Sequence, residues 1–515
     1  MARQMKAGHK FVLILLVMSG IGAAGWFGWP YLEKLAPPSR GASGGSSAPV
    51  AIPNNSKYDL VRVAVVTWGG YAGGQYFNRG FKPNPDSRYI QEYGLPVEFV
   101  VMDDYLASRE AWKAGEVHLL WATADSFPTE ASSMASFEPT IVFQSDWSRG
   151  GDVIVSREGI GSMRDLRGKR VSVAFGTPSH TFLLRMLESA GMSVRDIQIV
   201  EVPSAIDSAA AFKAGQVEAA VVWSPDDEDC VQSVRGSKRL VSTKEAAYII
   251  ADVFYGKKGW VESHQEELKA LVEGWLRGAA EVNTNPSAKA QAVRILAEGL
   301  NQPESFTEIA INNARLTTYG DNVNFFNLSG NATGVTGERL YMETGALYQA
   351  NTNLVSGRLP NWRQVTDTSA LRAVNLNGPE HAAEGQFQFA KATQAQASAE
   401  AFSSKAVSVS FPTGSATLDP NARTIIDLGF VPTAKAFASV RIRIEGNTDV
   451  TGSYDTNKRL SEARARAVAD YLAQEYGFDR NRFIVVGNGP DKPVCRDDSA
   501  DCYARNRRTD FELLQ

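Results

Sequence analysis

The sequence predicts three parts: one membrane-spanning helix, a two-lobed α/β domain and a smaller α+β domain at the C-terminus. Residues 11–32 form an uncharged apolar run, and a helix–glycine–strand unit occurs twice between residues 111 and 223. A polar stretch at 376–404 then precedes a new strand pattern. A chain of 515 residues with 43% hydrophobic residues is too long for one ordinary domain and can bury several cores.

Composition excludes two classes of function. Lys and Arg total 53 against 57 for Asp and Glu, giving a formal net charge of −4. This balance provides no basic field for nucleic acid, so we expect no nucleic-acid partner. The 3 Cys and 5 His residues show no metal-ligand spacing, so we expect neither a metal site nor a cofactor.

The N-terminal segment indicates the compartment. At about 1.5 Å per residue, residues 11–32 can cross a hydrocarbon layer of roughly 30 Å. Basic residues precede this run, which predicts that the N-terminus lies in the cytoplasm and that everything after residue 33 is exported. We therefore assign 1–33 as a single-pass membrane anchor. A cleaved signal peptide is the alternative, because small residues at 22–25 suit a peptidase.

Two stretches are predicted to link the folded parts. Residues 34–57 are rich in Pro, Gly and Ser and are expected to form a flexible linker. Residues 376–404 are rich in Gln, Ala and Ser and are expected to form a second linker. Ala and Gln favour helices, so a short helix within it is allowed. The strand-like run 407–411 then opens a C-terminal domain at 405–515.

The repeated unit predicts two similar lobes within residues 58–375, the second at about 151–244. Ala111–Val117 is similar to Ala211–Val217, and in each copy a glycine ends the helix before a short buried strand. Ligands of open α/β sheets lie beyond the carboxyl ends of the strands. The loops after four of the strands should therefore meet in a cleft between the lobes.

These loops provide the candidate solute-binding residues: Trp68, Gly69, Asp125, Thr177, Ser179, His180, Trp223 and Asp226. The helix start at 177–180 offers N–H and hydroxyl groups to an anion or a carbonyl. The indoles offer flat apolar walls, and Asp125 a polar contact. For the helix start, the alternative is that Thr177 or Ser179 is only an N-cap and that His180 faces solvent. For the tryptophans, the alternative is that they are only core residues.

An acidic run follows the strand of the second copy. Asp226 is the ligand candidate in the run 226–229, whereas Glu228 and Asp229 fit a solvated helix start. Carboxylates near the mouth of a cleft attract an amine and repel an anion. The solute remains open between a zwitterion, a pyrimidine and an anion.

A family resemblance covers roughly residues 58–370. Its motifs are Gly151-Asp-Val-Ile-Val-Ser156, Gly176-Thr-Pro-Ser-His180 and Ala220-Val-Val-Trp-Ser-Pro225. In their order and spacing these resemble periplasmic solute-binding proteins of the type II fold, in the nitrate, sulfonate and thiamine-precursor branch. The resemblance implies a two-lobed clamp that closes on a small molecule and delivers it to an ABC permease, which would be a separate partner.

A second resemblance covers residues 405–515. Gly446-Asn-Thr-Asp449, Arg464-Ala465 and Asn506-Arg507-Arg508 resemble the OmpA-like peptidoglycan-binding domain, an α+β fold. It implies that Asp449 and Arg464 hold the diaminopimelate of a stem peptide. The supporting residues it implies are Thr448, Asn457 and Arg508. Asn447 stands where histidine is common in the family.

The helix expected after Gly452 carries Arg464 and orients this site. Its expected core residues are Leu460, Ala463, Ala467, Val468, Tyr471 and Leu472, which recur at helical spacing. That face leaves Arg464 near the rim. A surface ion pair is the alternative for Arg464, and a basic patch at a strand end for 507–508.

The predicted export determines the expected bonding state of the cysteines. An oxidising compartment favours a disulfide between Cys495 and Cys502, which would add roughly 2 to 3 kcal/mol of stability. Cys230 is left as a buried or unpaired thiol.

The sequence thus predicts a non-catalytic solute receptor held by the inner membrane at one end and by peptidoglycan at the other. An enzyme is not expected, because no Ser/His/Asp elbow or metal constellation is present. The alternative is a structural or sensory envelope protein with no transport role.

Overall fold

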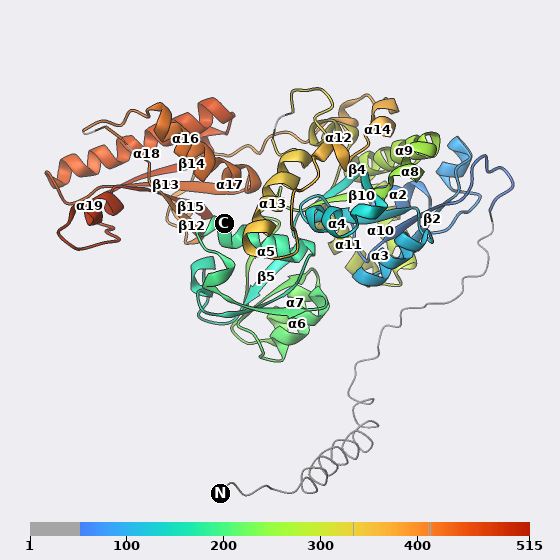
Figure 1. Ribbon diagram of the computed structural model, residues 1–515, viewed down its shortest axis with the longest axis horizontal. Helices are drawn as coiled ribbons and strands as arrows, with labels where there is room; N and C mark the ends of the chain where they lie inside the picture. Colours follow the sequence, from blue (N-terminus) through green and yellow to red (C-terminus); the bar gives the residue numbers. More distant parts are fainter. Residues whose placement is uncertain (1–51, 333, 410, 413) are drawn as a thin grey trace, which may run out of the picture. The chain divides into compact units, whose positions relative to one another are not determined.

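The computed structural model describes residues 52–332, 334–409, 411–412 and 414–515 (Figure 1). The membrane-spanning helix expected at 11–32 lies outside the described residues. Within those ranges, no helix combines the length and the apolar character needed to cross a bilayer.

The first lobe is built on a six-stranded sheet of order β11-β4-β10-β3-β1-β2. Its strands are β1 (Val61–Val65), β2 (Val97–Val101), β3 (Leu119–Thr123), β4 (Pro139–Ser148), β10 (Ala251–Lys257) and β11 (Ala314–Leu316). Strands β1, β2 and β3 are parallel, whereas β10 runs antiparallel to both β3 and β4. Strand β10 therefore returns the chain from the second lobe into the middle of the first sheet.

The second lobe has a five-stranded sheet of order β7-β6-β8-β5-β9. Its strands are β5 (Asp152–Ser156), β6 (Arg170–Ala174), β7 (Gln198–Val202), β8 (Ala219–Trp223) and β9 (Lys238–Ser242). Its helices are α5 (Pro178–Ser189), α6 (Ala205–Lys213) and α7 (Asp226–Ser233). The predicted two-lobed α/β architecture is confirmed.

The remaining helices before residue 376 belong to the first lobe or follow it in the chain. They are α2 (Ala72–Phe77), α3 (Tyr105–Ala114), α4 (Phe127–Ser133), α8 (Lys258–Ser263), α9 (Gln265–Thr284), α10 (Pro286–Leu300), α11 (Glu304–Asn312), α12 (Tyr319–Phe325), α13 (Gly337–Asn351) and α14 (Ser369–Ala373). Helix α13 packs on α4 of the first lobe and also contacts α5 of the second, through a Tyr348 to Thr181 hydroxyl contact of 2.8 Å. It thus links the two lobes.

The repeated unit has the same local structure in both copies. Gly115 ends α3 with a φ of +82°, and Gly215 follows α6 with a φ of +79°. In each copy the glycine and the next residue donate N–H bonds to carbonyls of the last helical turn. The left-handed backbone conformation at these positions explains the glycines, because side-chain-bearing residues adopt it at a cost.

The C-terminal domain has a four-stranded sheet of order β12-β15-β13-β14. Its elements are β12 (Ala401–Val407), α16 (Pro420–Gly429), α17 (Val431–Ala436), β13 (Arg441–Asn447), α18 (Tyr454–Tyr476), β14 (Phe483–Gly489), α19 (Ala500–Asn506) and β15 (Thr509–Leu514). The strand expected at 407–411 instead begins at Ala401, because β12 pairs with the whole of β15. The preceding stretch includes the short helix α15 (Gln394–Ala397), so it is partly ordered as allowed.

The predicted core face of α18 is partly wrong. Ala463 is exposed, whereas Ala465 and Ala469 are fully buried. The buried face therefore includes Arg464, whose side chain we placed near the rim. Apolar spacing alone did not distinguish these neighbouring small residues, and Arg464 enters the face because its guanidinium has backbone partners there.

The predicted disulfide is confirmed. Cys495 and Cys502 are bonded across a separation of seven residues, with their Cα atoms 5.3 Å apart. Asn506 holds the same loop, accepting from the N–H of Cys495 at 3.1 Å and donating to its carbonyl at 2.8 Å. Cys230 is buried and unpaired, and burial raises the pKa of its thiol to about 11.

The difference in backbone conformation between Gly115 and Gly259 predicts different effects when each is replaced by alanine. A Cβ at either Gly115 or Gly259 meets nothing within 4 Å, and only Gly115 has a positive φ. Gly115→Ala should therefore destabilise the chain by about 1 kcal/mol. Gly259→Ala, on the exposed helix α8, should leave stability unchanged or raise it. Thermal unfolding of the two variants beside the parent protein checks this, and an equal fall in both midpoints would contradict it.

The disulfide predicts a redox-dependent stability. Replacing both Cys495 and Cys502 by serine should destabilise the C-terminal domain by roughly 2 to 3 kcal/mol, because the unfolded chain gains freedom. Reductant should lower the unfolding midpoint of the parent protein to that of the double variant and leave the variant unchanged. A parent midpoint that does not respond to full reduction would contradict this.

Candidate functional site

The start of helix α5 places three predicted residues at the junction of the lobes. Thr177 is the N-cap residue, but its hydroxyl donates to the carbonyl of Ala174 at 2.8 Å and does not cap the helix. The Ser179 hydroxyl is fully buried and lies beside Asp152, whose pKa it acts to lower. A simple N-cap therefore does not account for either hydroxyl.

His180 is fully buried, so the alternative of a solvent-facing helix residue is wrong. Its Nδ1 accepts from the N–H of Gly176 at 3.3 Å, and its ring stacks on Phe175. Burial lowers the pKa of His180 to about 4, so the imidazole is neutral. Its Nε2 has no partner in the described part of the chain.

The glycine-rich loop 68–74 contains two predicted residues with different surroundings. Gly69 lies against the backbone of α11, where a Cβ would approach the carbonyl carbon of Ala310 to 2.2 Å. This close packing explains why position 69 is a glycine. The Trp68 indole is only partly buried, and its Nε1 donates to Asp146 Oδ1 at 3.3 Å. The same ring faces Gly151, at the start of the second lobe.

Asp125 belongs to a larger group of acids that sequence reasoning missed. The carboxylate cluster consists of Asp125, Asp146, Asp152 and Asp252, each at most 5% exposed. Asp146 and Asp252 face each other across β4 and β10. Asp152 opens β5 in the second lobe, opposite Trp223 of β8.

The cluster is electrostatically strained. Burial raises the pKa of Asp125, Asp146 and Asp152 to about 7 each. Burial, followed by the charge of Asp146, raises the pKa of Asp252 well above its ordinary value. Two facing carboxylates cannot both ionise without a counter-charge. Within the described residues, none of the four acids forms an ion pair.

Trp223 and Asp226, the last two predicted solute-binding residues, have different surroundings. Trp223 is partly buried beside Asp152, whereas Trp121 of β3 is 3% exposed and is a core residue. Asp226 lies in the first turn of α7, where its charge acts on Lys213 and Cys230. The neighbouring acids Asp227 and Asp229 pair with Arg239 and Lys213. The structure thus groups Trp68, Asp125, Ser179 and Trp223, and leaves Asp226 outside the carboxylate cluster.

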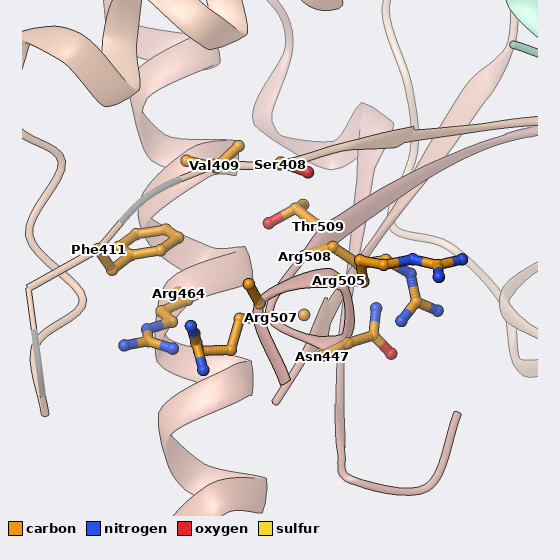
Figure 2. A pocket seen from close by; sticks show the side chains of 11 residues that line it. Ser408, Val409, Phe411, Asn447, Arg464, Arg505, Arg507, Arg508 and Thr509 are labelled. Carbon is orange, nitrogen blue, oxygen red and sulfur yellow. The ribbon is translucent and has the colours of Figure 1, made fainter. Parts of the chain in front are cut away.

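The C-terminal domain contains a cavity of about 480 Å³ (Figure 2). Its lining includes Phe411, Asn447, Arg464, Arg507 and Arg508. The guanidinium groups of Arg464 and Arg507 lie near each other in Figure 2. The cavity is therefore strongly basic and has one aromatic wall.

Asp449 supplies the negative charge next to this cavity. It is 6% exposed, and its Oδ2 accepts from Arg507 Nη1 at 2.6 Å. Burial acts to raise the pKa of Asp449, but hydrogen bonds from Thr451 and Arg507 outweigh it and hold the pKa below its ordinary value. The carboxylate is thus ionised at neutral pH.

Arg464 is held by the backbone and not by a surface ion pair. Its Nε donates to the carbonyl of Ser415 at 3.0 Å, and its guanidinium lies 5.0 Å from the centre of the Phe411 ring. Burial lowers its pKa, as does the charge of Arg507. Backbone carbonyls fix the position of this cation without neutralising it.

The three supporting residues implied by the resemblance, Thr448, Asn457 and Arg508, differ in their contacts. Asn457 donates to the carbonyl of Thr451 at 2.9 Å, and the buried Thr448 hydroxyl has no partner among the described residues. Arg508 pairs with Asp510 at 2.8 Å, so Arg507 and not Arg508 contacts Asp449. Sequence reasoning gave Arg507 no role, although the Asn-Arg-Arg motif contained it. Asn447 donates to Asp510 at 3.0 Å and lines the cavity.

Two family models match separate parts of this chain. Residues 410–507 match the model described as OmpA family, and residues 88–289 match the one described as NMT1/THI5 like. The first match contains Asp449, Arg464 and Arg507. The second contains the whole second lobe and the carboxylate cluster.

The curated relatives divide in the same way. The chain is 37% identical over 106 residues to the probable lipoprotein YiaD of Escherichia coli, covering 20% of this chain and 47% of that protein. It is 40% identical over 79 residues to the outer membrane porin F of Pseudomonas aeruginosa, covering 15% and 23%. It is 24% identical over 230 residues to the taurine-binding periplasmic protein of Escherichia coli, covering 44% and 66%. The chain thus spans less than two thirds of each of these relatives.

Solved structures similar to the chain include a binding protein and an enzyme. The periplasmic aliphatic sulphonate binding protein SsuA from Escherichia coli aligns with a TM-score of 0.48 and 18% identity, over 65% of this chain and 98% of that one. The desulfurization enzyme DSZB aligns with a TM-score of 0.42 and 14% identity, over 61% and 98%. From its two α/β lobes and the two family matches, this chain joins an NMT1/THI5-like domain of the type II periplasmic-binding-protein fold to an OmpA-like domain at its C-terminus.

Proposed function

We propose that this protein is a periplasmic solute receptor, anchored in the inner membrane by residues 11–32 and attached to peptidoglycan by its C-terminal domain. The two-lobed domain captures a small molecule and delivers it to an ABC permease. The envelope location is supported by the OmpA family match, by the periplasmic relative and by the disulfide between Cys495 and Cys502.

The wall-binding role rests on one observation: Arg464 and Arg507 line one cavity, and the ionised Asp449 is paired with Arg507 beside it. Diaminopimelate in a stem peptide presents both ammonium and carboxylate groups. Asp449 complements the ammonium, and Arg464 the carboxylate, through charge-assisted hydrogen bonds. The Nε and Nη2 atoms of Arg464 donate to the carbonyls of Ser415 and Pro412, which holds the guanidinium in place beside the cavity.

The internal partner of Asp449 indicates how the ligand enters. Arg507 is 48% exposed in its side chain, so its guanidinium can turn outward at little cost. The ammonium of the ligand then replaces it on Asp449, while Arg464 stays in place. Binding is thus an exchange of partners at a fixed carboxylate.

The solute-capture role is supported by the polar groups at the lobe junction. The carboxylate cluster draws its members from both lobes, and several of its polar atoms have no protein partner in the described chain. Such burial costs stability unless a ligand completes the site. A purely structural wall linker has no need of these groups, so we favour the receptor over the structural or sensory alternative.

Substitution at the cavity should abolish wall attachment. Asp449→Ala removes the partner of the ammonium and Arg464→Ala that of the carboxylate, so each should weaken binding by at least about tenfold. Pelleting of the full chain with purified sacculi measures this. Arg466→Ala is the matched control, because Arg466 is on the same helix but is exposed and pairs with Glu462. Pelleting of both cavity variants at the parent level, with unchanged circular dichroism, would refute the site.

The proposed orientation predicts where the C-terminus lies. Alkaline phosphatase fused after Gln515 should be active in intact cells, because that enzyme needs the oxidising periplasm. A fusion to a reporter that works only in the cytosol should be silent. The reverse pattern would remove both the wall contact and the receptor role.

A further inference from the structure

The carboxylate cluster is assembled by the fold from both lobes. Asp146 and Asp252 are directly opposed on neighbouring strands of the first sheet, and Asp152 opens the first strand of the second. Each charge acts on Asp252, and so does that of Asp125, which follows β3. Four acids separated along the chain therefore form one group.

The group has hydrogen-bonding capacity that the protein does not use. In the described chain, Asp125 Oδ2 and Asp152 Oδ1 are buried without a partner, as is the hydroxyl of Tyr71. Tyr71 feels the charges of Asp252 and Asp146, and the Ser179 hydroxyl lies beside Asp152, whose pKa it acts to lower as a hydrogen-bond donor. Buried polar groups are nearly always satisfied, so these unpaired atoms are available to hydrogen-bond a small molecule.

The sign of the ligand follows from the charges around it. Arg109 is the cation that acts on Tyr71, and it is already held by Glu130 at 2.6 Å. No Lys or Arg of the described residues pairs with the cluster. A sulfonate placed here would meet carboxylates without a compensating cation, whereas an ammonium or guanidinium would supply the missing counter-charge.

Two indoles add to this preference. Trp68 donates to Asp146, and Trp223 is opposite Asp152 in the β5–β8 register. Aromatic faces attract organic cations, and partly buried tryptophans do so most strongly. No group of three or more His, Cys, Asp or Glu side chains in the described ranges is arranged to hold a metal ion. The surroundings thus favour an organic cation over a metal.

We propose that the carboxylate cluster recognises an organic cation, a primary amine or guanidinium compound, and rejects sulfonates and other simple anions. This specificity rests on the solute-capture role proposed above. Asp152 and Asp146 bind the positive nitrogen from the two lobes. Closure of the lobes on a cation thereby removes the repulsion between the acids.

Titration calorimetry of the full chain tests the ligand class, with putrescine, agmatine and ethanesulfonate as probes. We expect saturable binding of putrescine or agmatine, at least tenfold tighter than that of ethanesulfonate. Binding of ethanesulfonate but neither cation would overturn the cation assignment and leave solute capture standing. If no probe binds and native mass spectrometry finds no retained molecule, solute capture fails as well.

Isosteric variants test the residues. Asp152→Asn and Asp146→Asn should each weaken binding of the cationic probe at least tenfold. They should also raise the unfolding midpoint of the free protein, because each removes an unpaired buried acid. Asp229→Asn is the control, since Asp229 is exposed and pairs with Lys213. Unchanged probe affinity in both cluster variants, or a lowered midpoint with full binding, would assign these acids a structural role and overturn the proposal.

Discussion

The central constraint in this molecule is the burial of four carboxyl groups, with no cation of the described chain paired to them. Removing a carboxylate from water costs several kcal/mol unless it is paired or protonated. Here the pKa values of three of the acids rise to about 7, so the protein holds them between charged and neutral forms. A fold under selection for stability alone would place apolar residues at these positions.

The topology explains how such an arrangement is maintained. Strand β10 inserts between β4 and β3, so Asp252 has a fixed neighbour on each side. Ser148 donates to Asp152 at 3.0 Å and contacts the Thr243 hydroxyl at 2.9 Å, which ties the two crossings between the lobes together. The acids therefore lie on rigid strands and their immediate flanks, where they cannot move apart to relieve repulsion.

Features that depend on a local sequence pattern could be predicted from the sequence. Features that depend on how distant strands pair could not. The repeat around Gly115 and Gly215 is visible because a left-handed helix end needs glycine, and Asp449 and Arg464 lie in a compact motif. Asp146 and Asp252 could not be predicted, because each is the single acid of its strand and only the register brings them together. Arg507 was missed for a related reason: adjacent arginines look equivalent in sequence, and the pairing of Arg508 with Asp510 separates their roles.

The ion pair between Asp449 and Arg507 has a consequence for the proposed attachment to the wall. In the proposed exchange an incoming ammonium displaces the guanidinium on Asp449, so the number of opposite charges in contact with that carboxylate stays constant. The gain at Asp449 is therefore smaller than an unpaired carboxylate would give, and attachment should be reversible. A receptor attached through this exchange could dissociate from one stem peptide and bind a neighbouring one. It would then move along the sacculus and not stay fixed to one glycan strand.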